Sequence, residues 1–432
     1  MDSPTIGKNC VRIVLAIAAS QHWIIKSTDI KSAFLQGQPI ERDVYLKPPK
    51  EACTESGHIW KLRRCLYGLN DAARQFYVTL ASELIKLGGI KSKLDPSLFS
   101  FSSEKGLIGV LVSHIDDFLH AGDKSFDKII DKLCERFSAG SREQIEFLYT
   151  GYQLKQSPDF SIHMDQNSYL KNVQVDCIPQ VRLTQKCSKL SEEELKTYRK
   201  YLGTLGWVVQ GTRPELAFSL LASSTKTKGA TIADLQQVTK TVIKAQSTEL
   251  KILFPDLGDP IKDSWRILCF ADASYANLSE GTGSSAGYII FLVGKENRSC
   301  PLTWKSNKIK RVCRSTAAAE GMSLSQALEE AMFNRNLLCE VLGIPSKNIQ
   351  VIGITDHEGL QGNICSALKP KVDDLRLRQE IAIMREHLQY SEVAQVKLCS
   401  TQCQLADCLT KKGAAAYNLL SVLEEGKLPS SF

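Results

Sequence analysis

The chain has 432 residues, 43% of them hydrophobic, and carries 54 Lys and Arg against 47 Asp and Glu, a formal net charge of +7. This composition excludes a disordered chain. The length is too great for one ordinary hydrophobic core and predicts two or three domains. No apolar run reaches the roughly 18 residues of a membrane span. The fourteen cysteines contain no C-x-x-C pair, so we expect reduced thiols in an intracellular protein without a membrane partner.

Short apolar strands and amphipathic helices alternate up to about residue 155. The runs "WIIKSTDI" and "GLIGVLVSHIDDFLHAG" predict strands, and "AARQFYVTLASELIKLGG" predicts a helix that ends at its Gly-Gly pair. The first strand reaches Asp29 as it ends, and the second contains the adjacent Asp116 and Asp117. Two carboxylates about 4 Å apart repel by roughly 4 kcal/mol at an effective dielectric of about 20. The pair therefore lies either in a turn open to water or beside a bound divalent cation.

The stretch from 156 to 260 reads as mainly helical. In "TIADLQQVTKTVIKAQSTEL", Thr231 is a plausible N-cap with Asp234 three residues later. The run "FPDLGDPIKDSW" at 254–265 is rich in turn residues and predicts a domain boundary.

From residue 264 to the end the pattern becomes strand, strand, strand, helix, strand, helix. The predicted strands are "RILCFADAS", "SAGYIIFLVG", "CPLTWKSN" and "NIQVIGITD", and the long helix begins at Ser315 or Thr316 and closes at Gly343. The basic run from Trp304 to Arg314 precedes this helix. It is either a solvated face or a contact for a polyanion.

Four carboxylates in this last region lie on separate elements. Asp272 follows the apolar run "ILCFA", Glu320 lies in the predicted first turn of the long helix, Asp356 follows "VIGIT", and Asp407 lies in "QLADCLTKK". Taken singly, Glu320 could favour the helix dipole and Asp356 could cap the next helix. Taken together they predict a cluster of oxygen ligands of the kind that Mg²⁺ prefers, and two such ions can serve phosphoryl transfer.

These motifs resemble, in order, the reverse transcriptase and ribonuclease H regions of copia-type LTR retrotransposon Pol polyproteins. The polymerase-like motifs are "STDIKSAFLQG", "LRRCLYGLNDAARQFY" and "HIDDFLHAG", and the nuclease-like motifs are "ADASYA", "SAGYIIFLVG", "LTWKSNK", "STAAAE", "TDHEGLQGN" and "QLADCLTKK". The resemblance implies an α+β and α/β chain of three parts. These are a palm over 1–155 with an antiparallel sheet and helices, a helical thumb or connection over 156–260, and a ribonuclease H-like mixed sheet over 264–432.

The resemblance also implies roles for the palm residues. Asp29 and Asp116 would bind two catalytic Mg²⁺ ions, with Mn²⁺ as the alternative cofactor, and Asp117 would lie beside them. Phe34 would be an aromatic gate against the ribonucleotide 2′-OH, or else an ordinary core residue. Gly68 would let the backbone approach the template–nucleotide pair, or else serve a plain turn.

In the nuclease-like part, Asp272, Glu320, Asp356 and Asp407 would form a tetrad that binds two metal ions. Water activated there would cleave the RNA strand of an RNA–DNA hybrid. Lys305 and Lys308, in the basic run, would neutralise backbone phosphates in a salt-sensitive way.

The partners implied are an RNA template, a DNA primer, an RNA–DNA hybrid, deoxynucleoside triphosphates and other parts of a Pol polyprotein. The resemblance implies that the protein acts in a cytoplasmic particle or in the nucleus, and no targeting signal in the sequence decides between the two. The family's fingers should precede the first palm motif, which here starts at residue 23, so we expect them to be missing or truncated. We therefore expect weak or absent primer extension but retained hybrid cleavage. The alternative is an inactive element remnant that only binds nucleic acid. The chain departs from the family pattern at His114, Asp71 and Glu358.

Overall fold

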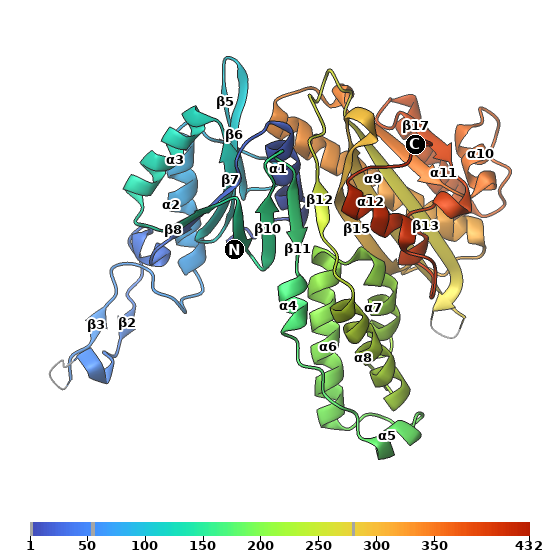
Figure 1. Ribbon diagram of the computed structural model, residues 1–432, viewed down its shortest axis with the longest axis horizontal. Helices are drawn as coiled ribbons and strands as arrows, with labels where there is room; N and C mark the ends of the chain where they lie inside the picture. Colours follow the sequence, from blue (N-terminus) through green and yellow to red (C-terminus); the bar gives the residue numbers. More distant parts are fainter. Residues whose placement is uncertain (1–2, 53–56, 279–280) are drawn as a thin grey trace. The chain divides into compact units, whose positions relative to one another are not determined.

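The structure is a computed structural model that describes residues 3–52, 57–278 and 281–432 (Figure 1). The chain forms two compact units. The first unit comprises Met1–Val14, Trp23–Thr150 and Glu340–Gly343, and the second comprises Leu15–His22, Gly151–Cys339 and Ile344–Phe432. Among the described residues, no helix combines the length and apolar character needed to cross a membrane.

The first unit is built on a six-stranded antiparallel sheet with the order β4-β5-β6-β7-β1-β8. Its strands are β1 (Lys26–Ile30), β4 (Ile90–Lys91), β5 (Leu98–Ser103), β6 (Gly106–His114), β7 (Asp117–Gly122) and β8 (Ala139–Gln144). The helices α2 (Ala72–Lys86) and α3 (Lys124–Arg136) pack on it because their apolar stripes, including Phe76 and Phe126, join a core with Phe101 and Phe118 of the strands. The predicted antiparallel sheet with helices is thus present. The other elements are the hairpin of β2 (Tyr45–Leu46) and β3 (Trp60–Lys61), and β9 (Glu146–Tyr149). Helix α1 (Lys8–Ser20) is divided, because its residues from Leu15 on belong to the second unit.

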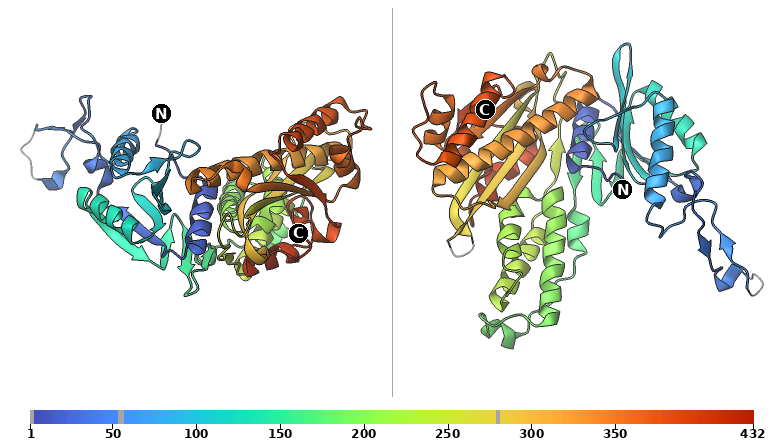
Figure 2. Two further views of the ribbon diagram at one scale, coloured as in Figure 1. Left: turned by 90° about the horizontal axis from the view of Figure 1, so that it is seen from above. Right: turned by 180° about the vertical axis from the view of Figure 1, so that it is seen from behind.

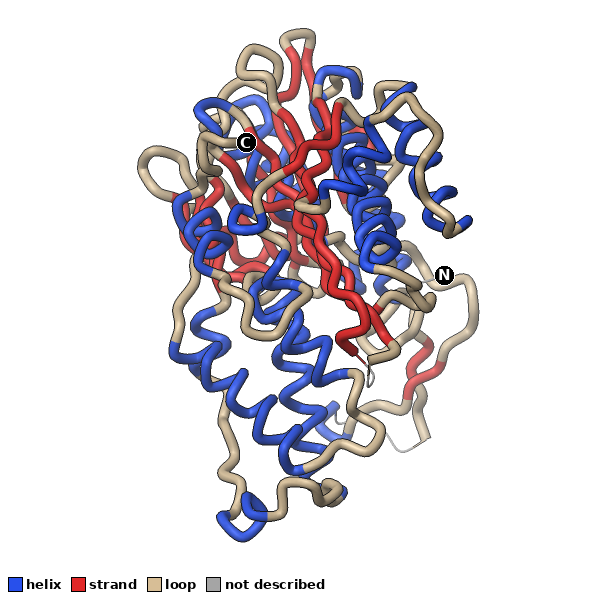
Figure 3. Tube along the Cα trace, turned by 90° about the vertical axis from the view of Figure 1, so that its right-hand side faces the viewer, coloured by secondary structure: helices blue, strands red, loops and turns tan. Residues whose placement is uncertain are grey.

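Three helices of the second unit lie side by side as a bundle: α6 (Glu192–Gly211), α7 (Ala217–Ser224) and α8 (Ile232–Ser247) (Figures 1 and 3). The predicted capping box of Thr231 and Asp234 starts α8. The buried Arg213 pairs with Glu215 at 2.7 Å and donates to the carbonyls of Ala245 and Thr248, which fixes the end of α6 to the end of α8. Two short helices, α4 (Asn167–Lys171) and α5 (Gln180–Thr184), precede the bundle.

Short strands lie near both ends of the region 156–260, which the sequence predicts to be mainly helical. β11 (Ile162–Asp165) pairs antiparallel with β10 (Tyr152–Gln156) and with β12 (Ile252–Phe254). In β12 the two outer residues are buried and the middle one is only partly buried. A strand of three or four residues is too short for its period of two to stand out in a sequence.

The rest of the second unit contains a five-stranded mixed sheet, β15-β14-β13-β16-β17. β13 (Arg266–Leu278), β14 (Gly283–Val293) and β15 (Ser299–Lys308) are antiparallel, and β16 (Gln350–Thr355) and β17 (Gln395–Leu398) add in parallel. The sequence did not predict β17, which has four residues of which one is buried. The long helix α9 (Thr316–Leu342) lies along one face, where Ala318 and Ala319 meet Ala273 and Ala286 (Figure 2). The remaining helices are α10 (Glu358–Cys365), α11 (Leu375–Gln389) and α12 (Tyr417–Glu425).

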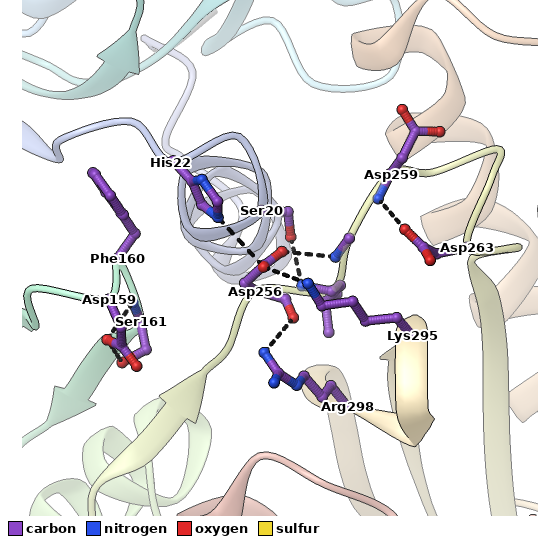
Figure 4. Close-up of polar contacts among 12 residues, drawn as sticks. Ser20, His22, Asp159, Phe160, Ser161, Asp256, Asp259, Asp263, Lys295 and Arg298 are labelled. Carbon is purple, nitrogen blue, oxygen red and sulfur yellow. Dashed lines mark hydrogen bonds and ion pairs between the residues drawn. The ribbon is translucent and has the colours of Figure 1, made fainter.

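The turn-rich segment at 254–265 is held in place by polar contacts within the second unit (Figure 4). The Asp256 carboxylate accepts from Lys295 Nζ at 2.7 Å and from the Gly258 N–H at 2.8 Å, and its Oδ2 lies 3.3 Å from His22 Nε2. Trp265, which is 1% exposed, donates to the carbonyl of Leu257. The segment is therefore an anchored connection, and the domain boundary predicted there stays a prediction.

The Asp256 contacts make stability depend on pH. Partial burial opposes ionisation, but the hydrogen bonds from Lys295 and Gly258 outweigh it and lower the pKa of Asp256 below its ordinary value. A lowered pKa stabilises the fold above the unfolded value of about 3.9, and this stabilisation is lost as the pH falls through the folded value. Asp256→Asn should therefore lower the free energy of unfolding by about 1–3 kcal/mol at pH 7 and by much less near pH 3.

Thermal unfolding of the full chain at the two pH values measures this difference. The matched control is Asp373→Asn, the same chemical change at an exposed aspartate, which should leave the unfolding temperature nearly unchanged at both pH values. Equal losses for Asp256→Asn at pH 7 and pH 3 would contradict the assignment of the effect to the ionised carboxylate.

Candidate active sites

The structure brings Asp29, Asp116 and Asp117 together where the neighbouring inner strands β1 and β7 meet the β6–β7 turn, a place named the palm edge below. Asp29 on β1 is the direct cross-strand partner of Asp117 on β7, and the Ile30 N–H donates to the Asp116 carbonyl at 2.9 Å. Asp116 lies in the tight turn between β6 and β7, where Ile115 takes a positive φ of 61°. Register and turn together produce the convergence expected from the sequence.

This edge carries an electrostatic cost. Burial, together with the charges of Asp29 and Asp116, raises the pKa of Asp117 to about 7, against a hydrogen bond from Ser27 Oγ (3.1 Å) that favours the ionised form. Burial and the charge of Asp116 likewise raise the pKa of Asp29. A cation bound between these carboxylates would relieve the repulsion, since an opposite charge favours the ionised form.

Tyr67 is a residue of this site that the sequence reasoning missed. Its hydroxyl donates to Asp116 Oδ2 at 3.2 Å, and its ring centroid lies 4.4 Å from that of Phe34. Phe34 is 9% exposed and packs into the hydrophobic core from the short 3₁₀ helix Ala33–Gln36. The core interpretation thus describes its packing, and its role as a gate stays a prediction. The position of Tyr67 directly before Gly68 in "LYGL" was the available signal.

Two glycines leave room around the palm carboxylates. Gly68 has a φ of +96°, which side chains rarely adopt, and no described atom lies within 4 Å of where its Cβ would stand. A Cβ on Gly140 of β8 would lie 2.5 Å from Asp29 Oδ2. Glycine at 140 therefore lets the β8 backbone approach the carboxylate. A lone glycine in a loop-like stretch offers no sequence signal for this.

In the second unit, three of the four predicted carboxylates form one compact cluster. An oxygen from each of Asp272, Glu320 and Asp356 lies within 4.8 Å of the others, and no other group of three acidic, His or Cys residues among those described meets this criterion. Asp272 is 1% and Glu320 5% exposed.

Asp272 lies within β13, which continues to Leu278, whereas β16 pairs with β13 only as far as Phe270. One local expectation for this cluster is wrong. Glu320 is the fifth residue of α9, and the first turn of that helix contains no acidic residue. Interaction with the helix dipole therefore does not account for Glu320.

Asp407, the fourth predicted carboxylate, joins the site through a lysine. Lys411 Nζ donates to Asp407 Oδ1 and lies 3.4 Å from Asp272 Oδ1, and Thr410 Oγ1 donates to Asp272 Oδ2. The sequence reasoning named neither Thr410 nor Lys411, although both lie in the quoted motif "QLADCLTKK".

The cluster fits a divalent cation. Burial, then the charges of Asp272 and Asp356, raise the pKa of Glu320, and burial raises that of Asp272 against the opposing effect of Lys411. Glu320 Oε2 is buried and accepts no hydrogen bond from the residues that the structure describes. An oxygen left in that state favours a further positive ligand.

The predicted phosphate contacts lie on β15, and both lysines are exposed. Asp272 on β13 pairs across the sheet with Gly287 on β14, which in turn pairs with Ser306 on β15. Because strand side chains alternate, Lys308 shares the face of Asp272 and Lys305 points to the other face. Their phosphate-binding role stays a prediction.

The departures from the family motifs have local explanations in two cases. Asp71 accepts a hydrogen bond from Arg42 at 2.6 Å, so its extra negative charge is paired. Glu358 lies in the first turn of α10, where a negative charge suits the helix dipole. His114 ends β6 opposite Asp117, and its Nδ1 is buried without a hydrogen-bond partner among the described residues.

Comparison with known proteins agrees with this arrangement. Residues 1–189 match the family model for reverse transcriptase (RNA-dependent DNA polymerase). The chain is 29% identical over 448 residues to the Pol polyprotein of transposon RE1 from Arabidopsis thaliana, covering 99% of the chain and 29% of that protein. It is 25% identical over 381 residues to the Pol polyprotein of transposon TNT 1-94 from Nicotiana tabacum, covering 81% and 27%.

The chain is similar to copia-type Pol polyproteins over most of its length. The predicted resemblance is confirmed, and the chain spans less than a third of the length of these curated relatives. The foamy viral protease-reverse transcriptase, solved in complex with RNA/DNA hybrid, matches with a TM-score of 0.52 at 12% identity, over 96% of this chain and 48% of that one. The fold is therefore that of a reverse transcriptase with a ribonuclease H-like mixed sheet, as predicted.

The raised pKa of Asp117 predicts that the free energy of unfolding of the metal-free protein falls as the pH rises. An acid with a raised folded pKa stabilises the fold at low pH, and that contribution is lost as the pH rises from about 4 through about 7. Asp117→Asn removes the charge, so at pH 8 its free energy of unfolding should exceed that of the wild type by about 1–2 kcal/mol, allowing for partial exposure.

Thermal melts with a chelator present, at pH 4.5 and pH 8, measure this effect. The variant should gain over the wild type only at pH 8, and Glu135→Gln on the exposed side of α3 should gain at neither. A wild type whose stability relative to Asp117→Asn is the same at both pH values would show that Asp117 ionises normally.

Proposed function

We propose that the second unit hydrolyses the RNA strand of an RNA–DNA hybrid with the help of divalent cations. The observation that carries this proposal is the buried cluster of Asp272, Glu320 and Asp356, with one Glu320 oxygen unpartnered. Asp272 comes from β13 and Glu320 from α9, and Asp356 directly follows β16, so their convergence supports a role as ligands. The foamy viral protein of similar fold, solved in complex with an RNA/DNA hybrid, supports this choice of substrate.

In this proposal Asp272, Glu320 and Asp356 hold the cation, Mg²⁺ or Mn²⁺. Asp407, which contacts the same Lys411 ammonium as Asp272, is the further ligand of a second one. When bound, such an ion supplies a Lewis acid at a phosphoryl oxygen. Burial keeps Asp272 and Glu320 out of bulk water. Charges interact more strongly in such a low-dielectric interior than they do in water. The exposed Lys308 and the part of the basic run that follows it, residues 309–314, contact backbone phosphates without reading the base sequence.

We further propose that the palm edge is the nucleotidyl-transfer site of an RNA-directed DNA polymerase. Asp29 and Asp116 hold Mg²⁺ there, and Tyr67 orients Asp116 through its hydroxyl. Deoxynucleoside triphosphates meet the edge beside Phe34 and Gly68, with an RNA template and a DNA primer.

The second candidate function is nucleic-acid binding without turnover. The palm departure at His114, whose Nδ1 is buried without a described partner, favours this function for the first unit. Turnover assays on one preparation separate the two candidates.

A reciprocal pair of variants tests the assignments. Asp272→Asn should lower Mg²⁺-dependent cleavage of hybrid RNA by at least about 100-fold, because it removes a central metal ligand. It should leave any primer extension unchanged. Asp116→Asn should abolish any primer extension and leave hybrid cleavage unchanged.

Asp373→Asn serves as the matched control and should alter neither activity. Loss of hybrid cleavage in Asp116→Asn, or its survival in Asp272→Asn, would contradict the assignment of the two chemistries to the two sites. A wild type that binds hybrid and neither cleaves nor extends would support the binding-only candidate.

A further inference from the structure

The nuclease cluster contains an ammonium group at a place where a cation would bind. Lys411 Nζ contacts one oxygen of Asp272 and one of Asp407, residues 135 positions apart in the chain. The side chain of Asp272 is 1% exposed, and that of Lys411 is 39% exposed. The lysine thus reaches in from solvent to a buried carboxylate.

The electrostatics of the cluster explain this contact. The carboxyl groups of Asp272, Glu320 and Asp356 lie close together, and like charges this near repel one another. Lys411 Nζ contacts Asp272 and also Asp407. Its positive charge therefore offsets part of the repulsion.

The segment that carries Lys411 is fixed independently of its ammonium. The Thr410 carbonyl accepts from Asn277 Nδ2 and from Ser285 Oγ, each at 2.8 Å. Ser306 Oγ donates to the Leu409 carbonyl at 2.6 Å. The flexible lysine stem can therefore leave the carboxylates while the backbone keeps its place.

We propose that the Lys411 ammonium is the resident counter-ion of the nuclease site and competes with divalent cations for Asp272 and Asp407. This inference rests on the proposed nuclease function. Lys411 leaves its position between the two carboxylates when a cation binds, so it sets the metal concentration at which the site fills. It is a positioning residue that acts through Asp272 and Asp407.

Metal binding without substrate tests the competition directly. Mn²⁺ binding to the full chain is measured by the loss of the free-ion EPR signal, in a background of Asp116→Asn that removes a palm ligand. Lys411→Met keeps the apolar stem and removes the charge. If the lysine occupies the site about nine-tenths of the time, its removal should lower the apparent dissociation constant about tenfold.

The neighbouring Lys412, which is exposed, gives a matched control, because Lys412→Met makes the same change in net charge. It should leave the dissociation constant within about twofold of the background chain. The metal-free Lys411→Met chain should also melt at a lower temperature than the metal-free Lys412→Met chain, and the difference should shrink as Mn²⁺ is added. Equal or weaker Mn²⁺ binding by Lys411→Met would overturn the competition while leaving the nuclease proposal standing.

A second measurement uses the unmutated lysine, in case Lys411→Met does not fold. Labelling of lysines by an amine-reactive reagent, followed by peptide mass spectrometry, should show faster labelling of Lys411 at saturating Mn²⁺ and no change at Lys412. Unchanged labelling of Lys411 while Mn²⁺ is bound would overturn the inference. Absence of Mn²⁺ binding to every variant would overturn both the inference and the proposed nuclease function.

Discussion

The second unit depends on one constraint, the mutual repulsion of carboxylates buried at the end of a mixed sheet. Asp272 and Glu320 are almost wholly inaccessible, and with Asp356 they place oxygens within 4.8 Å of one another. Such a cluster costs free energy unless positive charge or hydrogen-bond donors face it. The donors present, Thr410 and Lys411, engage Asp272 and leave one Glu320 oxygen unsatisfied. This imbalance suits a site that has to accept a further cation.

Much of the surrounding structure serves to bring the 404–411 segment to Asp272. Gln404 Nε2 donates to the Ala271 carbonyl at 2.9 Å, beside the carboxylate itself. A Cβ on Gly287, the cross-strand partner of Asp272, would stand 2.8 Å from Leu409 and Thr410. Glycine at that position therefore lets the segment lie directly on the sheet. The palm edge solves the same problem with a hairpin turn and a tyrosine hydroxyl, at carboxylates that are less deeply buried.

The sequence predicted those features whose signal is local. The amphipathic helices α2 and α8 and the long, mostly buried helix α9 begin and end close to where the sequence indicates. The apolar strands of both main sheets are where their composition places them. Asp29, Asp116, Asp272 and Asp356 could be nominated because each adjoins an apolar run, whereas Glu320 and Asp407 were nominated from the motifs that contain them. The sequence did not predict the strands β11, β12 and β17, because three or four residues carry too little of the alternating pattern of a strand. It also did not predict the roles of Tyr67, Gly140 and Lys411. Their contacts depend on strand register and on chain segments far apart in sequence, which no periodicity encodes.

The central claim is that the buried cluster of Asp272, Glu320 and Asp356 exists to bind a divalent cation. Crystals of the full chain grown with Mn²⁺ test it most directly, through anomalous scattering measured at the manganese absorption edge. The account predicts an anomalous peak about 2 Å from oxygens of these carboxylates, with the Lys411 ammonium moved away from Asp272. A well-ordered cluster at saturating Mn²⁺ with no anomalous peak, and with Lys411 still on Asp272, would contradict it.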